Sequence, residues 1–84
     1  MINKLNQLIG KSTVLEMDNK LMQLGASEYD SILNGDNIYY AFENESHAYT
    51  IDGTDYNICF KYDEEAEFEQ KEDVEIEITK IEIL

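Results

Sequence analysis

The spacing of apolar residues changes along the chain, from a helical period in the first part to alternation in the second. In residues 2–9 apolar side chains recur every three or four positions, which predicts a short amphipathic helix with Gly10 as its C-cap. Ser27 is a candidate N-cap for a second helix over residues 27–34, because acidic residues occupy its first turn. We expect Gly35 to stop this helix.

Residues 13–24 allow two interpretations. Thr13 and Glu16 have the spacing of a capping box, and the apolar residues that follow fit one helical face. Alternatively, Asp18 and Asn19 form the turn of a hairpin between two short strands. We prefer a strand at residues 13–17, and we leave open whether residues 18–24 form a strand or a helix.

From Asn37 onward the period is two, which predicts strands. The first strand spans residues 38–42 and places Tyr39 and Tyr40 on opposite faces, and residues 43–46 form a turn. The pair Asp52–Gly53 is typical of a two-residue hairpin turn. It joins a strand containing Tyr49 to a long strand that ends near Tyr62.

The last predicted strand covers residues 74–83 and contains a change of parity. Apolar residues alternate up to Ile78 and then resume at Ile81 with the opposite parity. Either a bulge at Thr79–Lys80 resets the register or both faces are partly covered near the C-terminus, and we favour the bulge or a bend. The chain of 84 residues is one domain. We predict an α+β fold, with two short helices packed on one face of a mostly antiparallel sheet of four or five strands.

Charge is concentrated in the second half of the chain. The net charge is −13, from 19 acidic residues and six lysines. Residues 1–42 contribute −2 (five acids, three lysines) and residues 43–84 contribute −11 (fourteen acids, three lysines). Such a balance disfavours direct binding to nucleic acid or to an anionic membrane, because both require basic side chains. Solubility alone would also account for the acidity, but its asymmetry favours an acidic surface for a basic partner.

Residues with catalytic potential are few. His47 is the only histidine and falls in or beside the predicted turn, and Cys59 has no histidine placed to activate it. The segment 52–63 has the length of a calcium loop, but Thr54 and Tyr56 occupy ligand positions. We therefore expect no enzymatic activity, no catalytic residue, no cofactor and no metal site.

The single cysteine indicates a reducing compartment, since no disulfide can form within the chain. The N-terminal residues do not have the pattern of a signal peptide, and no apolar run approaches the ~20 residues that span a membrane. We expect a cytoplasmic protein, in the host cell cytoplasm if it is encoded by a phage. We expect a monomer or a weak dimer.

The acidic surface is predicted to lie on residues 63–77. In a strand, Asp73, Glu75 and Glu77 are roughly 6.6–6.8 Å apart at every second position, and phosphates in one DNA strand advance about 3.4 Å per nucleotide. The carboxylates can thus lie near alternate phosphate positions in a basic groove. The residues predicted to contact a partner here are Glu64, Glu65, Glu67, Glu69, Glu72, Asp73, Glu75 and Glu77.

Three segments support a resemblance to a known family: an acidic segment at 14–19, an apolar one at 24–33 and an aromatic–acidic turn at 41–46. With the size, charge and element order, they resemble the phage-encoded inhibitors of uracil-DNA glycosylase, which are acidic DNA mimics. The resemblance implies an edge strand whose carboxylates, here Glu16 and Asp18, enter the DNA groove of the enzyme. It also implies an apolar pocket that captures the enzyme's intercalating side chain, formed here by Leu24, Tyr29, Ile32 and Leu33. The family's glutamine–glutamate–serine strand motif is replaced by residues 17–19.

The chain is also similar in size, charge and helix-plus-sheet composition to small acidic anti-CRISPR proteins, which occupy the site where a Cas nuclease reads its target duplex. Our first hypothesis is therefore a DNA mimic that inhibits a host nucleic-acid enzyme by filling its basic cleft. The alternatives are an immunity protein that neutralises a basic nuclease toxin, and a small phage structural or assembly protein.

Overall fold

The computed structural model describes residues 1–63 and 68–84, and it describes side chains outside residues 64–70. The chain forms the following helices, 3₁₀ turns (η) and strands in order: α1 (Ile2–Asn6), β1 (Gly10–Thr13), α2 (Val14–Gln23), η1 (Glu28–Asp30), α3 (Asn37–Asn44), β2 (Ser46–Ile51), β3 (Thr54–Tyr62), η2 (Phe68–Asp73) and β4 (Glu75–Ile83). This is an α+β fold, as the sequence predicted.

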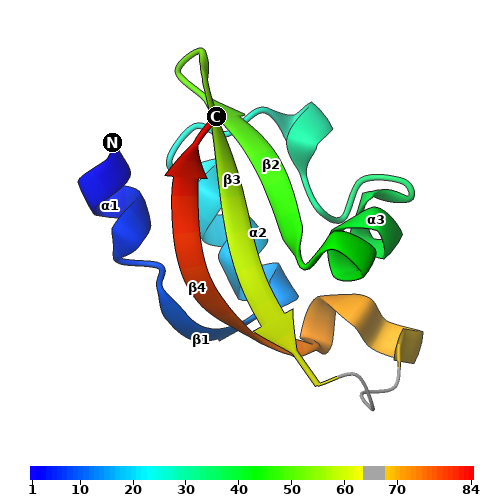
Figure 1. The fold of residues 1–84 in the computed structure, drawn as a ribbon. Coiled ribbons are helices and arrows are strands. Elements are labelled where there is room, and N and C mark those ends of the chain that lie inside the picture. Colours follow the sequence, from blue (N-terminus) through cyan, green and yellow to red (C-terminus); the bar gives the residue numbers. More distant parts are fainter. Residues whose placement is uncertain (64–67) are drawn as a thin grey trace.

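The four strands form one antiparallel sheet with the order β1-β4-β3-β2. In Figure 1 the sheet faces the viewer and α2 crosses behind it, while α3 and η2 lie near the end of the sheet where β3 leaves and β4 enters. The helices α1 and α2 therefore cover one face. The other face, which we call the open face, carries no helix in the described part of the chain.

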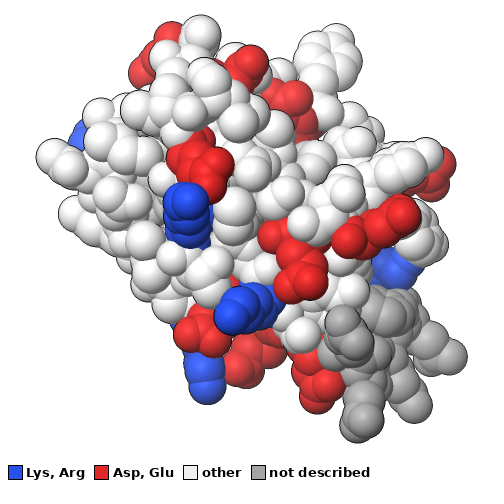
Figure 2. Space-filling model, viewed as in Figure 1, with Lys and Arg blue, Asp and Glu red and all other residues white. Residues whose placement is uncertain are grey.

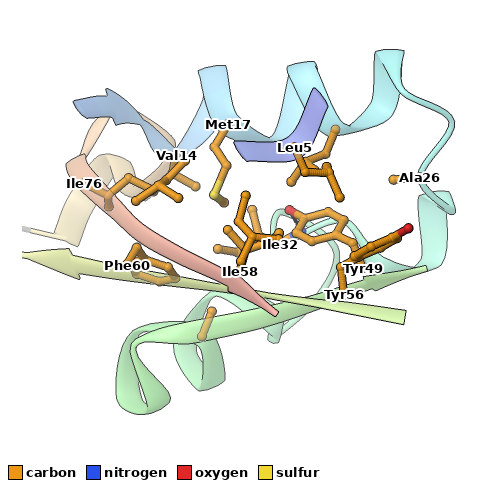
Figure 3. Packing of buried hydrophobic residues seen from close by; sticks show 14 of the residues in the cluster. Leu5, Val14, Met17, Ala26, Ile32, Tyr49, Tyr56, Ile58, Phe60 and Ile76 are labelled. Carbon is orange, nitrogen blue, oxygen red and sulfur yellow. Dashed lines mark hydrogen bonds between the residues drawn. The ribbon is translucent and has the colours of Figure 1, made fainter. Parts of the chain in front are cut away.

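The core fills the space between α2 and the sheet. Every second residue of β3 from Tyr56 to Phe60 is buried, and Met17 and Leu21 of α2 pack against this face. Figure 3 shows α2 on one side of this cluster and the strands on the other, with Leu5 reaching it from α1. Burying a side chain of this size contributes about 1.5–3 kcal/mol, so this layer is the main source of stability.

A bulge resets the register of β4. Cys59 pairs with Lys80 and Phe60 pairs with Ile78, so Thr79 is the extra residue. The bulge turns Ile81 toward the core, where it is buried, although its parity is opposite to that of Ile78. The predicted bulge at Thr79–Lys80 is confirmed.

The predicted strand at residues 13–17 is wrong, because these residues begin helix α2. The Thr13 hydroxyl accepts a hydrogen bond from the Glu16 backbone N–H (3.2 Å), and the Glu16 carboxylate accepts one from the Thr13 N–H (3.3 Å). This capping box satisfies two N–H groups that the first turn would leave unpaired. Val14, Met17 and Leu21 then place their side chains in the core at helical spacing.

The predicted strand at residues 38–42 is also wrong, since residues 37–44 form α3. Ile38 and Phe42 are compatible with both periods because they are four positions apart. Ala41 decides between them: it is buried, as only a helix would place it beside Ile38 and Phe42. As a result Tyr39 and Tyr40 do not lie on opposite faces of a strand, and both are exposed.

Two helices are shorter than predicted. The first ends at Asn6 rather than Ile9, and the predicted helix over residues 27–34 is reduced to η1. Ser27 makes no side-chain cap bond. Asp30 instead accepts a hydrogen bond from the Thr50 N–H (2.9 Å), which holds this segment against the edge of β2 rather than continuing a helix.

The hairpin between β2 and β3 is confirmed. Asp52 and Gly53 have φ values of 51° and 79°, the left-handed pair that this turn requires. β3 extends from Thr54 to Tyr62, as the alternation predicted. His47, however, lies within β2 rather than in a turn, and it is half-buried.

Candidate partner-binding surface

Exposed carboxylates gather at the end of the sheet where β3 leaves and β4 enters. We call this surface the acidic end; within the described residues it comprises Glu43, Glu45, Asp63, Glu72, Asp73 and Glu75. All six are exposed. Figure 2 shows acidic residues over this part of the molecule. Of the predicted contact residues, Glu64, Glu65 and Glu67 lie outside the described residues, and so does the side chain of Glu69.

Backbone hydrogen bonds hold the elements of the acidic end together. Helix α3 ends at Glu45 in the left-handed conformation (φ 54°), and the Glu45 carbonyl accepts a hydrogen bond from the Phe60 N–H (3.0 Å). At the other side, the Val74 N–H donates to the Lys71 carbonyl (3.2 Å), and the Val14 N–H donates to the Val74 carbonyl (3.1 Å). The ends of α3 and η2 are therefore attached to the sheet and to α2.

The acidic strand has a different environment from the one that the sequence predicted. Glu75 and Glu77 point away from the core and are exposed, as predicted. However, Glu77 lies directly between Lys11 of β1 and Lys61 of β3 in the strand register. Side chains opposite one another on a sheet face have Cβ atoms about 4.5–5.5 Å apart, so two cations flank the Glu77 carboxylate.

Further along the open face the charges are also mixed. Lys80 and Glu82 form an ion pair at 2.6 Å. A depression of about 530 Å³ between β1, β4 and β3 is lined by Lys11 and Lys61 as well as by Glu75 and Glu77. The open face is therefore less negative than residues 73–77 alone imply, and it adjoins the acidic end, because Asp63 and Glu75 line the same depression as the two lysines.

Asp18, predicted to face a partner, is instead part of the core. It is only 4% exposed. Its carboxyl group accepts hydrogen bonds from the Ser31 hydroxyl (2.9 and 3.0 Å) and from the Tyr49 hydroxyl (2.8 Å), which in turn accepts one from the Ile32 N–H (3.1 Å). Asp18 therefore joins α2 to β2 and to the segment after η1.

This network shifts the titration of Tyr49. Burial, together with the neighbouring Asp18 carboxyl, raises the pKa of the Tyr49 hydroxyl far above its ordinary value. Tyr49 thus stays protonated, and its hydroxyl donates a hydrogen bond to the Asp18 carboxyl group. Glu16, the other carboxylate of the predicted strand, is exposed but acts as the capping residue of α2.

The four predicted pocket residues do not form a common pocket. Ile32 is fully buried, whereas Tyr29 is 87% exposed. Leu24 lines a separate depression beside α1 and α2, and Leu33 is exposed. The reason is the missing helix at 27–34: without helical periodicity, these side chains do not share one face.

An open depression that the sequence did not predict lies beside the acidic end. We call it the aromatic pocket; it has a volume of about 350 Å³, and its described lining residues are Tyr39, Phe42, Glu43, Tyr62 and Lys71. The rings of Phe42 and Tyr62 are stacked, with centroids 4.7 Å apart. A prediction of helix for residues 37–44 would have placed Tyr39, Phe42 and Glu43 on one side, because Phe42 and Glu43 follow Tyr39 by three and four positions.

The contacts of His47 and the environment of Cys59 are those of residues that support the fold. The His47 Nε2 donates a hydrogen bond to the Asp30 carbonyl (2.7 Å), and its ring contacts Tyr49 edge-on. Burial, and then the Glu82 carboxylate, raise the pKa of the Cys59 thiol, partly opposed by Lys80. The thiol is thus protonated and weakly nucleophilic at neutral pH.

The described part of the chain carries neither a metal-binding cluster nor a membrane-spanning helix. Among residues 1–63 and 68–84, no cluster of three or more His, Cys, Asp or Glu side chains is arranged to hold a metal ion. No helix in this part of the chain has both the length and the apolar character needed to cross a bilayer. Comparisons with protein-family models, with curated proteins and with solved structures found no match to this chain.

Proposed function

We propose that this protein is a non-catalytic inhibitor that uses its acidic end as a mimic of DNA phosphates, filling the basic cleft of a nucleic-acid-binding enzyme of the host. The observation that supports this most directly is the position of exposed carboxylates in and just after α3, just after β3, in η2 and at the start of β4, which all lie near one end of the sheet. Uracil-DNA glycosylase and CRISPR–Cas nucleases are the target classes that the sequence resemblance suggests.

The physical argument rests on how basic clefts bind nucleic acid. A cleft lined by Lys and Arg attracts any surface that presents several negative charges, and association is accelerated by long-range steering. Carboxylates held by a folded domain can take the place of nucleic-acid phosphates beside the Lys and Arg side chains of such a cleft. Because the charges are solvated before binding, the contribution to affinity falls as salt concentration rises.

The structure changes which residues we assign to this function. Asp18 is no longer one of the residues proposed to contact the partner, because it is buried and hydrogen-bonded within the core. Glu77 is assigned only a minor role in partner binding, because Lys11 and Lys61 flank it. Glu43 and Glu45 are added, since α3 ends next to β3.

The test is inhibition of purified uracil-DNA glycosylase, a Cas nuclease and a restriction enzyme, each at low salt. The double variant Glu72→Lys with Asp73→Lys should weaken inhibition at least about tenfold, as expected for losing close charge pairs at an interface. The matched control is Glu28→Lys with Asp36→Lys, which makes the same change in net charge at exposed positions outside the acidic end.

Two results would count against the proposal. One is that none of the three enzyme classes is inhibited by the folded protein. The other is that both double variants weaken inhibition equally, which would mean that net charge matters and the acidic end does not. Glu77→Lys alone should have a smaller effect than either acidic-end substitution.

An immunity protein for a basic nuclease toxin would use the same surface and the same physics, and only the identity of the inhibited enzyme distinguishes it. The assembly alternative requires a free strand edge. The outer edge of β2 is partly occupied, since Ser27 N–H donates to the Thr50 carbonyl (3.0 Å) and Asp30 accepts from the Thr50 N–H. Strand pairing at the β2 edge is therefore disfavoured, whereas β1 is the other outer strand of the sheet.

A further inference from the structure

The aromatic pocket is large enough for a flat side chain and opens beside the acidic end. We propose that it receives an arginine side chain of the basic partner, and that Lys71 occupies the cation position of this pocket until the partner displaces it. This inference rests on the proposed function, because it names the group by which a basic partner would be anchored.

The base of the pocket is packed against the core. Phe42 is 5% exposed and contacts Phe60 of the core edge-on, with ring centroids 5.8 Å apart. Tyr62 stacks on Phe42 at an interplanar angle of 30°. Because Phe42 and Tyr62 are held by the core and by β3, a ligand would meet a preformed surface, which lowers the entropic cost of binding.

The chain's own lysine indicates which ligand the pocket suits. The Lys71 Nζ lies 2.9 Å from the centroid of the Tyr39 ring, a cation–π contact. The ring face is therefore already used by a cation. Tyr39 is 60% exposed, so a cation from outside can reach the same ring.

Charge at the rim adds to this preference. Glu43 lines the pocket, and Asp63 follows Tyr62 directly in the chain. A cation entering the pocket thus approaches past carboxylates, while an anion or a neutral apolar group would gain nothing from them. The rim belongs to the acidic end, so a partner bound there would bring its basic side chains to the pocket.

The aromatic walls favour arginine over lysine. A guanidinium is planar and weakly hydrated, so it stacks on aromatic rings while its N–H groups bind a carboxylate. An ammonium is compact and more strongly hydrated, and it loses more solvation on entering. A stacked pair of rings, the Tyr39 ring and the Glu43 carboxylate supply both kinds of contact that arginine uses.

The first experiment is an NMR titration of the isotope-labelled protein with hexa-arginine, hexalysine and hexacitrulline peptides at low salt. We expect hexa-arginine to shift the ring signals of Tyr39, Phe42 and Tyr62 and to move the Lys71 side-chain signals. Hexalysine should bind the acidic end with smaller shifts in the pocket. Hexacitrulline, which has the shape but not the charge, should shift none of these signals.

The second experiment compares two neighbouring tyrosines. Tyr39→Leu should weaken hexa-arginine binding about two- to fivefold, the range for one exposed cation–π contact. Tyr40→Leu is the matched control, because Tyr40 is 63% exposed on the same helix but is not among the residues found to line the pocket. Both substitutions are at exposed positions, so the core is unchanged.

The third comparison tests the role of Lys71. Lys71→Ala removes the internal competitor and should strengthen hexa-arginine binding about two- to fivefold. Lys20→Ala removes the same charge from α2 and should strengthen it less. Equal effects of these two variants would overturn the competitor role.

The outcomes separate this inference from the proposed function. If hexa-arginine shifts acidic-end signals but not the pocket rings, or if Tyr39→Leu and Tyr40→Leu behave alike, the pocket is not an arginine site while the acidic end still binds cations. If no basic peptide shifts any acidic-end signal at low salt, the proposed function fails as well.

Discussion

The carboxyl group of Asp18 and the carboxylates of the acidic end have opposite relations to the fold. Asp18 is buried, and two hydroxyl groups donate hydrogen bonds to it. The carboxylates of the acidic end are exposed to water. The first stabilises the native state because its loss would leave donors unpaired in the core. Exposed carboxylates such as Glu72 and Asp73 repel like charges near them, which reduces stability, and they face the solvent from which a partner would approach.

This contrast shows that the position of an acidic residue in the sequence does not reveal its role. Asp18 lies in the nearly neutral half of the chain and is structural, because α2 turns it toward Tyr49. Glu77 lies in the acidic half but is flanked by two lysines. How much an exposed carboxylate adds to a negative surface therefore depends on the charges of its neighbours in the fold.

The largest expected effect is that of Asp18→Ala. It removes the acceptor for the Ser31 and Tyr49 hydroxyls and should lower the free energy of unfolding by about 2–4 kcal/mol. Urea denaturation measures this change. Asp36→Ala is the control, since Asp36 is exposed and makes no side-chain cap bond; its effect should stay within about 0.5 kcal/mol. If Asp18→Ala and Asp36→Ala lower the free energy of unfolding equally, burial of the carboxyl group does not decide its effect on stability.

Tyr49→Phe should lower stability by a smaller amount, about 1–2 kcal/mol, because one hydroxyl is lost from the same network. It should also change the pH dependence. The folded pKa of Tyr49 is raised above the unfolded value of about 10. Above that pH the unfolded chain loses the proton and the folded chain keeps it, so stability is complete below about pH 10 and falls as pH rises further.

The measurement for this prediction is the urea midpoint at about pH 8 and about pH 11 for both proteins. The wild type should lose more stability than Tyr49→Phe over this interval. If both lose the same amount, the Tyr49 hydroxyl is not the group responsible.

Neutralising part of the acidic end should raise stability slightly. Glu72→Gln with Asp73→Asn should add about 0.5 kcal/mol at low salt, because like charges are separated by water and only moderately repulsive. In about 1 M salt the gain should disappear, since the screening length falls to ~3 Å. A gain that persists at high salt would mean that the two residues destabilise the fold by a mechanism other than charge.

The smallest effect concerns Glu77 on the open face. A double-mutant cycle of Lys61→Gln with Glu77→Gln should give a coupling of about 0.2–0.5 kcal/mol, typical of an exposed cross-strand pair. The same cycle with Lys61→Gln and Glu72→Gln is the control and should give no coupling. A coupling free energy of zero in the first cycle would mean that Lys61 does not offset the charge of Glu77, and Glu77 would then count with the carboxylates of the acidic end.

Local chemistry was enough to predict the hairpin and the bulge. Asp52 and Gly53 tolerate left-handed φ values, and two alternating segments flank them, so few other structures are possible there. The change of parity between Ile78 and Ile81 likewise requires an extra residue if both are to reach the core. These features depend on residues that are close together in the chain.

Helix α3 and most of the candidate site could not be predicted in the same way. Ile38 and Phe42 fit both periods, and the alternation of apolar residues favoured a strand. The role of Asp18 depends on Tyr49, 31 positions away, and the environment of Glu77 depends on the register of three strands. Such contacts involve residues that only folding brings together.

By itself, then, the sequence determined the α+β class, the antiparallel hairpin, the bulge and the acidity of the second half. The tertiary structure decided which carboxylates are exposed together, that Asp18 is buried, and where an aromatic pocket lies beside the acidic end. The physical reason is that turn and period preferences act over a few residues, whereas burial and charge balance depend on which strands and helices become neighbours in space.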